Sequence, residues 1–236
     1  MKFLGRKLRH ELKYYLHPQE YITLRQRIAA LLPLDSHALD QNGYGIRSLY
    51  FDGPQDSALF NKSNGIFRRH KYRIRIYNGS DRMIKLERKH KFGEYVNKES
   101  ASLGKDEYDQ ILLGDFSCLQ SSTIPLVKDF YGALVHEGYS PAAVVDYMRE
   151  AYVYEHGDVR ITFDKRLAAG INSYDMFDPG LILTETLDST RTIMEVKYNE
   201  YLPDIIRLLA NPHASNRSAI SKYVICREIA KQHFKR

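Results

Sequence analysis

Cysteine is scarce in this sequence, which contains Cys118 and Cys226 and no other cysteine. One long-range disulfide and two free thiols are both open, and two free thiols in a reducing compartment are the better interpretation. The cysteines and histidines also lack the spacing of a zinc site. The scarcity of cysteine therefore predicts a protein of a reducing compartment without structural zinc.

Long hydrophobic runs are missing as well. No stretch of about 20 apolar residues is present, so no membrane-spanning helix is expected. The N-terminal sequence MKFLGRKLRH has no apolar run of the length found in signal peptides. We therefore expect a soluble, cytoplasmic protein.

Glycine-rich phosphate-binding loops are also absent, since the chain contains neither G-x-x-x-x-G-K-[ST] nor G-x-G-x-x-G. No Ser–His–Asp or Cys–His arrangement stands out either. These absences exclude the common P-loop and dinucleotide-binding fingerprints. Any binding of phosphate has to depend on other residues.

The chain does have enough apolar residues for a large core and a modest excess of positive charge. It has 236 residues, of which 43% are hydrophobic, and a formal net charge of +6. With no linker or low-complexity segment, a single domain over residues 1–236 is expected. The charge alone leaves nucleic acid, phosphorylated small molecules and anionic membranes open as partners.

The most informative stretch is Lys71–Lys91, KYRIRIYNGSDRMIKLERKHK, which predicts two strands joined by an Asn-Gly turn. The period-2 alternation of a strand places Arg73 and Arg75 on one face of the first strand. Lys85 and Glu87 lie on one face of the second strand. The opposite faces of both strands carry Ile, Leu and Tyr, as expected for a half-buried hairpin.

The concentration of cations on one face of this hairpin has an energetic cost. Like charges that face one another across a strand pair destabilise it by about 0.2–1 kcal/mol per pair. Solvent screens that repulsion on an open surface, but a concave and partly dehydrated face needs an anion among its cations. We therefore interpret this face as the wall of a cavity that holds a polyanion.

Similar alternation recurs elsewhere in the chain. Further strands are predicted at residues 6–16, 45–52, 92–99, 143–154, 159–165, 181–187 and 190–198. A basic amphipathic helix is the alternative for residues 6–16. Helices are predicted at residues 18–32, 104–114, 123–138, 202–210 and 218–233, with Ser218 as the N-cap of the last helix and a short helix or loop at residues 55–64. The pattern predicts an α+β fold in which a β-barrel turns its charged face inward and helices pack outside.

The residues expected to face the interior are mostly basic. The cations are Arg9, Lys13, Arg73, Arg75, Lys85, Arg149, Arg160, Lys197 and Lys222, and the carboxylates are Glu11, Glu87 and Glu195. Arginine guanidinium groups hold phosphate oxygens in a bidentate manner, and carboxylates can hold a divalent cation beside them. Each residue taken singly has an alternative role, as a solvated charge for the cations or as a salt-bridge partner for Glu11. Nucleic acid is disfavoured, because the cations are spread along strands without a face of stacking aromatics.

Several motifs together resemble the VTC domain, the catalytic domain of the vacuolar transporter chaperone polyphosphate polymerases in the CYTH or triphosphate tunnel metalloenzyme superfamily. The resemblance runs in order from about Arg9 to about Arg227. The motifs that carry it are KYYLHP at 13–18, SLYFD at 48–52, KYRIRIY at 71–77, KLERK at 85–89, VDYMREAY at 145–152, VRITFD at 159–164, MEVKY at 194–198 and SKY at 221–223.

This resemblance implies an eight-stranded antiparallel tunnel that transfers the γ-phosphate of ATP to a growing polyphosphate chain with Mn2+ or Mg2+. The implied catalytic residues, which contact phosphates, are Lys13, Arg73, Arg75, Lys85, Arg149, Arg160 and Lys222. The implied substrate-binding residues are Tyr147, Lys197 and Ser221. Arg9, which the strand pattern places on the inward face, is predicted to bind substrate with them. The implied metal ligand is Glu195, with Glu87 and Glu11 as further candidates.

One departure from the superfamily pattern concerns the first strand. The hydrolases of the superfamily typically open with Glu-x-Glu-x-Lys, whereas the first carboxylate is replaced here by Arg9. Losing a ligand and gaining a cation favours the polymerase over a triphosphatase or an adenylate cyclase. A metal-dependent triphosphate or polyphosphate hydrolase and a non-catalytic polyphosphate-binding module are the alternatives.

The expected partners are ATP and inorganic polyphosphate. Eukaryotic members of the family also carry a phosphate-sensing domain and membrane helices, and this chain shows neither. The sequence therefore does not identify a membrane-associated protein partner.

Overall fold

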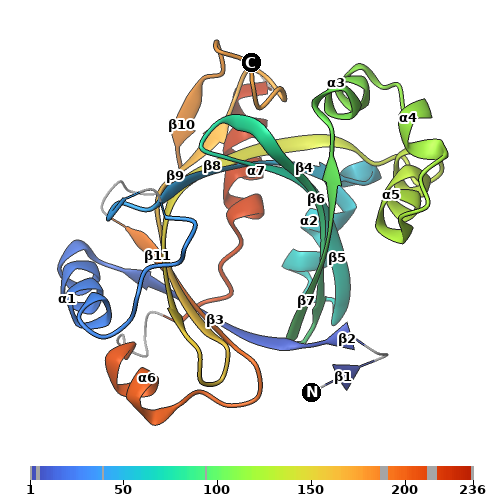
Figure 1. The fold of residues 1–236 in the computed structure, drawn as a ribbon. Coiled ribbons are helices and arrows are strands. Elements are labelled where there is room, and N and C mark those ends of the chain that lie inside the picture. The colour runs from blue at the N-terminus through green and yellow to red at the C-terminus, as the bar shows by residue number, and fades with distance from the viewer. Residues whose placement is uncertain are drawn as a thin grey trace.

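The fold is organised around a ring of antiparallel strands (Figure 1). The computed structural model of the protein describes residues 2–3, 6–38, 40–93, 95–186, 191–211 and 217–234. Its strands are β1 (Lys2–Phe3), β2 (Arg6–Lys7), β3 (Arg9–Leu16), β4 (Tyr44–Asp52), β5 (Arg68–Tyr77), β6 (Ser80–Phe92), β7 (Tyr95–Leu103), β8 (Ser140–Tyr154), β9 (Val159–Gly170), β10 (Leu183–Glu185) and β11 (Thr192–Tyr198). Its helices are α1 (Pro18–Ala29), the short 3-10 helix η1 (Pro54–Asp56), α2 (Ser57–Ser63), α3 (Lys105–Leu113), α4 (Ser117–Gln120), α5 (Pro125–Val135), α6 (Asp204–Leu209) and α7 (Lys222–Phe234).

The order of strands around the ring is β9–β11–β3–β7–β6–β5–β4–β8, and β8 pairs with β9 to close it. The predicted eight-stranded antiparallel tunnel is thus confirmed, with β10 added outside the ring on β9. The ring is irregular where β3 meets β7, because among the described residues that ladder has two pairs, Arg9↔Val96 and His10↔Tyr95. Further along β3, its edge pairs with the segment before α7, where the backbone N–H of Ser218 donates to the carbonyl of Lys13.

The predicted hairpin is present as β5 and β6. Asn78 and Gly79 both have positive φ, 52° and 66°, as a two-residue hairpin turn with the twist of its strands requires. The register places Arg75 opposite Lys85 and Arg73 opposite Glu87, so the predicted pairing of charged faces is also confirmed.

The strand predicted at residues 92–99 has wrong boundaries. Phe92 ends β6 and pairs with Tyr95, which begins β7, so Gly93 lies in a tight turn between two strands. Its φ of 57° is easily adopted by glycine and rarely by other residues. Because β7 continues to Leu103, it contributes side chains to the ring that the shorter prediction left out.

Other boundaries also shift. β9 continues to Gly170, beyond the end of the strand predicted at residues 159–165. The helix predicted at 123–138 ends at Val135, and the strand predicted at 181–187 is reduced to Leu183–Glu185. Leu187 and Thr190, at the ends of predicted strands, lie outside the described residues. That residues 1–236 form a single domain stays a prediction.

The apolar faces of the strands lie outward and are covered by helices. Ile74, Ile76 and Leu86 pack with α3, α4 and α5 in one buried cluster. On the side of α1 and α6, a second cluster includes Phe163 and Met194. The predicted outer position of the helices is confirmed for these elements, and the charged faces of the strands are left for the interior, which we call the lumen.

Helix α7 is placed differently, because its first turn lies inside the ring. Figure 1 shows the segment before α7 crossing the middle of the ring. Tyr223 and Val224 pack there against Tyr50 and Tyr147, which are lumen residues of β4 and β8.

The predicted N-cap of this helix, Ser218, is wrong. Ser218 is part of the segment that pairs with β3, and the helix starts at Lys222. Ser221 is the N-cap, since its Oγ accepts from Val224 N at 3.4 Å and its carbonyl accepts from Ile225 N.

Asp52, at the end of β4, anchors α7 in this position. Its carboxylate accepts from the backbone N–H groups of Gly53, Ala58 and Leu59, at 2.8, 2.6 and 3.1 Å, and from the hydroxyl of Tyr223. One buried carboxylate therefore joins β4, the start of α2 and α7. This connection holds the first turn of α7 at a fixed place in the lumen.

The Tyr223→Phe variant tests this anchor. Removing the hydroxyl takes one donor from buried Asp52 while three backbone donors remain, so we expect a loss of about 1–2 kcal/mol in the free energy of unfolding. Urea denaturation measures it, and Tyr201→Phe is the control because Tyr201 is exposed. An unchanged midpoint for Tyr223→Phe would show that the hydroxyl contributes nothing.

Both cysteines, Cys118 and Cys226, are free thiols, as predicted. In the described part of the chain, no helix is both long enough and apolar enough to cross a membrane. A cytoplasmic location stays a prediction.

Candidate active site

The lumen contains a group of buried carboxylates, each held by several cations. The most central is Glu195 on β11. Its carboxylate lies 2.6 Å from Lys222 Nζ, 2.9 Å from Lys197 Nζ, 3.1 Å from Lys13 Nζ and 3.6 Å from Arg149 Nη2. Burial by itself would raise the pKa of Glu195, but these cations hold it well below its ordinary value. Glu195 is therefore ionised at neutral pH.

The neighbouring carboxylate is Asp164 on β9. It accepts a bidentate pair of hydrogen bonds from Arg149, at 2.6 and 2.7 Å, and lies 2.6 Å from Lys222 Nζ. The guanidinium of Arg149 and the ammonium of Lys222 also lie over the ring of Tyr147, at 5.3 and 5.2 Å from its centroid. Arg149 and Lys222 thus connect Asp164 to Glu195.

A second set of ion pairs surrounds Glu87 on β6. Arg73 Nη2 lies 2.6 Å, Lys98 Nζ 2.7 Å and Arg75 Nη1 3.6 Å from its carboxylate. Burial would raise the pKa of Glu87, but the positive charges of these residues lower it strongly. Arg75 in addition donates to the hydroxyl of Tyr147 at 3.2 Å, so this set is continuous with the residues around Glu195.

Glu11 on β3 is the fourth carboxylate of the lumen and is joined to Glu195 through shared cations. It lies 2.7 Å from Lys89 Nζ, 3.5 Å from Lys197 Nζ and 4.0 Å from Lys13 Nζ. Because Lys13 and Lys197 also pair with Glu195, Glu11 and Glu195 share two cations. The lumen therefore contains a continuous network of alternating charges.

Most of the residues predicted from the sequence meet in this network. Those that take part in it are Glu11, Lys13, Arg73, Arg75, Glu87, Tyr147, Arg149, Glu195, Lys197 and Lys222. Ser221 lies beside it, at the start of α7.

Three predicted residues lie at the margin of the lumen. Lys85 donates to Ser102 at 2.8 Å near one end of β6 and β7. Arg160 donates to the carboxylate of Asp35 at 2.6 Å and to Tyr44, and its buried Nε has no hydrogen-bond partner among the described residues. Arg9 is exposed at the start of β3. Their assigned roles in phosphate binding stay predictions.

Sequence reasoning missed Asp164, Lys89 and Lys98 as members of the network, as well as Lys71 beside it. Period-2 alternation with Arg73 and Glu87 was a sufficient signal for Lys71 and Lys89. Lys98 lies within the strand predicted at 92–99, but no inward face was assigned to that strand. Asp164 is four residues after Arg160 in the strand predicted at 159–165, so period-2 alternation places both on one face, but Asp164 was not counted among the site residues.

The proposed metal ligands do not form a ready-made metal site. Glu11, Glu87 and Glu195 are each neutralised by ammonium or guanidinium groups at short distance. Within the described residues, no three His, Cys, Asp or Glu side chains are grouped so that they could hold a metal ion. The donor set therefore does not fit a bare divalent cation, and the role of these residues as metal ligands stays a prediction.

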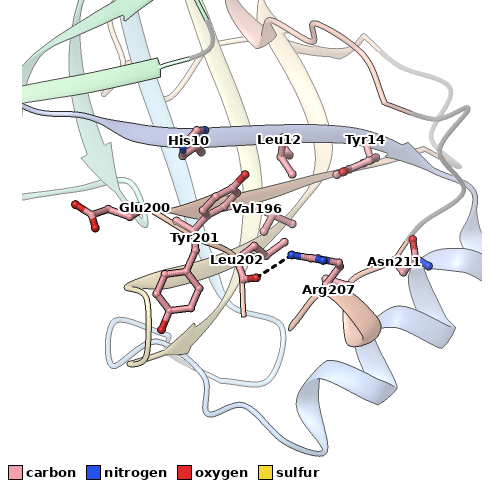
Figure 2. A pocket seen from close by; sticks show the side chains of 11 residues that line it. His10, Leu12, Tyr14, Val196, Glu200, Tyr201, Leu202, Arg207 and Asn211 are labelled. Carbon is pink, nitrogen blue, oxygen red and sulfur yellow. Dashed lines mark hydrogen bonds between the residues drawn. The ribbon is translucent and has the colours of Figure 1, made fainter. Parts of the chain in front are cut away.

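A separate pocket lies on the outer side of β3 and β11 (Figure 2). It has a volume of about 460 Å³, and its walls include His10, Leu12 and Val196, which alternate along the strands with Glu11, Lys13 and Glu195. The pocket and the lumen therefore lie on opposite faces of the same strands. None of the predicted site residues lines this pocket.

The family model of the VTC domain matches residues 8–231, almost the whole chain. The chain belongs to the VTC domain family. This confirms the family resemblance found in the motifs. None of the curated proteins matches this VTC-domain chain.

Solved structures with a similar fold include three of low sequence identity to this chain. A protein from Pyrococcus horikoshii has a TM-score of 0.52 at 12% identity, covering 92% of this chain and 98% of that one. A putative adenylate cyclase from Vibrio parahaemolyticus has a TM-score of 0.50 at 13% identity, covering 93% and 98%. A conserved hypothetical protein from Pyrococcus furiosus has a TM-score of 0.50 at 10% identity, covering 92% and 99%. At these identities the likeness shows the fold alone, which is the CYTH-like tunnel.

Membership of the VTC domain family supports a function related to nucleotides or polyphosphate. The superfamily generally uses divalent metals. The particular reaction of this VTC-domain protein is a separate question.

Proposed function

We propose that this VTC-domain protein is a polyphosphate polymerase, which transfers the γ-phosphate of ATP to a phosphate chain in the lumen. One observation carries the proposal. The four carboxylates Glu11, Glu87, Asp164 and Glu195 are each shared by two or more cations. These cations are Lys13, Arg73, Arg75, Lys89, Lys98, Arg149, Lys197 and Lys222.

The excess of buried positive charge is unfavourable without a further anion. A phosphate chain supplies negative charge along its whole length, and its oxygens match the guanidinium groups of Arg73 and Arg75. The ion pairs hold these side chains in place before substrate arrives. The lumen is therefore preorganised for a linear polyanion.

Phosphoryl transfer requires mainly that the reacting groups are positioned and that the developing charge is neutralised. In the proposed reaction Arg149 and Lys222 stabilise charge near Asp164 and Glu195. The hydroxyl of Tyr147 helps to place a phosphate beside Arg75. Mn2+ or Mg2+, when bound together with the phosphates, would supply further positive charge. Arg9, in place of a carboxylate, favours polyanion binding over hydrolysis.

The decisive experiment is an analysis of products after incubation with ATP and either Mn2+ or Mg2+. A polymerase yields chains of phosphate that are longer than the triphosphate of ATP. Orthophosphate as the sole product would instead identify a hydrolase.

A non-catalytic polyphosphate-binding module is the second candidate. It is favoured by the absence of a metal-holding group among the described carboxylates and by the ion pairs that engage each of them. This candidate predicts binding of polyphosphate without turnover of ATP.

Arg75→Ala and Lys85→Ala test whether the lumen binds the substrate. Loss of a charge-assisted phosphate contact weakens binding by about 1.5–3 kcal/mol. For Arg75→Ala we expect a loss in binding free energy at the upper end of this range, because Arg75 is buried. For Lys85→Ala we expect a loss at the lower end, because solvent screens the charge of a residue at the margin of the lumen. Isothermal titration calorimetry with ATP and tripolyphosphate measures both.

Lys128→Ala is the matched control, because Lys128 is exposed on α5 outside the ring. Its affinity for ATP should equal that of the wild type. If Arg75→Ala also bound ATP and tripolyphosphate like the wild type, the site would not be in the lumen.

A further inference from the structure

Lys71 on β5 is a part-buried lumen cation that has no carboxylate partner among the described residues. Its ammonium lies 3.5 Å from Ser221 Oγ and 4.3 Å from the ring centroid of Tyr223, both at the start of α7. It forms no ion pair with any of the described residues. By contrast, each of the lumen lysines of the network, Lys13, Lys89, Lys98, Lys197 and Lys222, pairs with at least one carboxylate.

The charged groups that face Lys71 come from three neighbouring strands and its own. Lys89 on β6, Lys13 on β3 and Arg69 on β5 are cations, and they oppose its protonation. Asp52 on β4 favours protonation, but its carboxylate already accepts from the backbone at the start of α2 and from Tyr223.

These surroundings leave the positive charge of Lys71 poorly compensated. Burial, reinforced by the neighbouring cations, lowers the pKa of Lys71 from 10.5 to about 7. A charged ammonium that is partly removed from water and lacks an ion pair destabilises the folded protein unless a bound anion neutralises it.

The position of Lys71 along β5 suggests which anion. Lys71, Arg73 and Arg75 follow one another on the lumen face, and Arg75 and Lys71 are four residues apart, about 13 Å at ~3.3 Å per residue. A triphosphate held by Arg75 and Arg73 ends short of Lys71, whereas a longer phosphate chain continues to it.

We infer that Lys71 and Ser221 form a further phosphate subsite, which is filled by a polyphosphate chain and not by ATP. This inference rests on the proposed function of the lumen. Within the subsite the ammonium of Lys71 pairs with a phosphate oxygen, and the hydroxyl of Ser221 donates to the same group. The subsite gives the protein a preference for long chains over short ones.

The subsite also links binding to proton uptake. A bound phosphate stabilises the protonated amine, so the pKa of Lys71 rises on binding. Binding is then strongest below pH 7, where Lys71 is already protonated. Lys71 by itself weakens binding by about tenfold between pH 6 and pH 8, because a proton has to be taken up. Burial lowers the pKa of Lys89 to about 7 as well, so Lys89 adds its own pH dependence in the same range.

Two variants of Lys71 test the inference by calorimetric titration with tripolyphosphate and with a longer polyphosphate chain. Lys71→Met keeps the length of the side chain and removes its charge. We expect it to bind the long chain at least tenfold more weakly at pH 6 and tripolyphosphate as the wild type does. It should also melt at a higher temperature than the wild type, since an uncompensated, part-buried charge is lost.

Lys71→Arg keeps a charge that does not titrate in this range. It should bind the long chain at pH 6 like the wild type, and between pH 6 and pH 8 its binding should weaken about tenfold less than that of the wild type, which leaves the contribution of Lys89. The phosphate chain also titrates in this pH range, but its protonation affects the wild type and Lys71→Arg equally. The difference between the two proteins therefore reports the contribution of Lys71. Lys128→Met, on the outside of the ring, should behave like the wild type throughout.

Failure of the inference and failure of the proposed function give different results. If the wild type binds the long chain, and Lys71→Met binds it equally well or Lys71→Arg shows the same pH dependence as the wild type, the subsite is wrong and the lumen proposal stands. If the wild type binds neither phosphate compound, both are wrong.

Discussion

Glu195→Gln is expected to lower the free energy of unfolding by about 3–5 kcal/mol, the usual cost of removing one partner from a buried ion pair. The carboxylate is surrounded by Lys222, Lys197, Lys13 and Arg149, and a neutral amide leaves these cations in mutual repulsion. Urea denaturation at pH 7 measures the difference. Glu155→Gln, which removes an exposed carboxylate, is the control and should change little.

The pH dependence of this difference has a definite sign. Burial raises the pKa of Glu195, but the four cations outweigh burial and hold it well below its ordinary value of 4.5. The stabilisation is therefore fully present above about pH 4.5 and is lost as the pH falls further. The wild type and Glu195→Gln should approach one another in stability in acid. A difference that stayed constant as the pH fell below 4 would contradict the ion-pair explanation.

Glu195→Gln also separates structure from catalysis. A bound polyanion takes over the neutralising role, so tripolyphosphate should stabilise the variant more than it stabilises the wild type. Turnover of ATP, if the proposed reaction occurs, should fall more than substrate binding does. An unchanged rate would remove Glu195 from the reacting centre and leave it a structural role.

Arg149→Met is the second substitution with a large expected effect, again about 3–5 kcal/mol in the free energy of unfolding. Arg149 makes both hydrogen bonds of a bidentate pair with Asp164, and both side chains are buried. The methionine fills most of the space but leaves Asp164 with Lys222 as its charged partner. ATP binding should weaken as well, because a guanidinium beside Tyr147 is lost.

A double-mutant cycle with Asp164→Asn distinguishes the ion pair from a general loss of packing. If the pair accounts for the effect, Arg149→Met/Asp164→Asn should be more stable than the sum of the two single losses predicts, by about 1–3 kcal/mol. Strictly additive losses would show that Arg149 and Asp164 act independently.

The period-2 pattern was sufficient to predict which way most strand residues face. Arg73 and Arg75 alternate with Ile74 and Ile76, and burying the apolar face under α3–α5 leaves one side for the cations. The closure of the sheet and the sharing of Glu195 by cations from three strands and a helix could not be read from the local pattern. Both depend on contacts between segments far apart in the chain.

The errors in the predicted helix start and in the predicted position of Arg160 also come from contacts between distant segments. Ser218 has the residue type of an N-cap, but pairing with β3 keeps it extended, so the helix starts later, at Lys222. Asp35 lies in a loop for which no strand or helix pattern was available, and it draws Arg160 to the edge of the lumen. Tertiary contacts override local preference at both positions.

The entry of α7 into the ring has a consequence for the order in which the chain folds. Lys222, near the C-terminal end of the sequence, shares Glu195 with Lys13, near the beginning. A nascent chain that still has its last helix inside the ribosome can pair β4 to β7 but cannot complete the charge network. Completion of the charge network therefore depends on contacts between segments far apart in the sequence, and it follows the local pairing of β4 to β7.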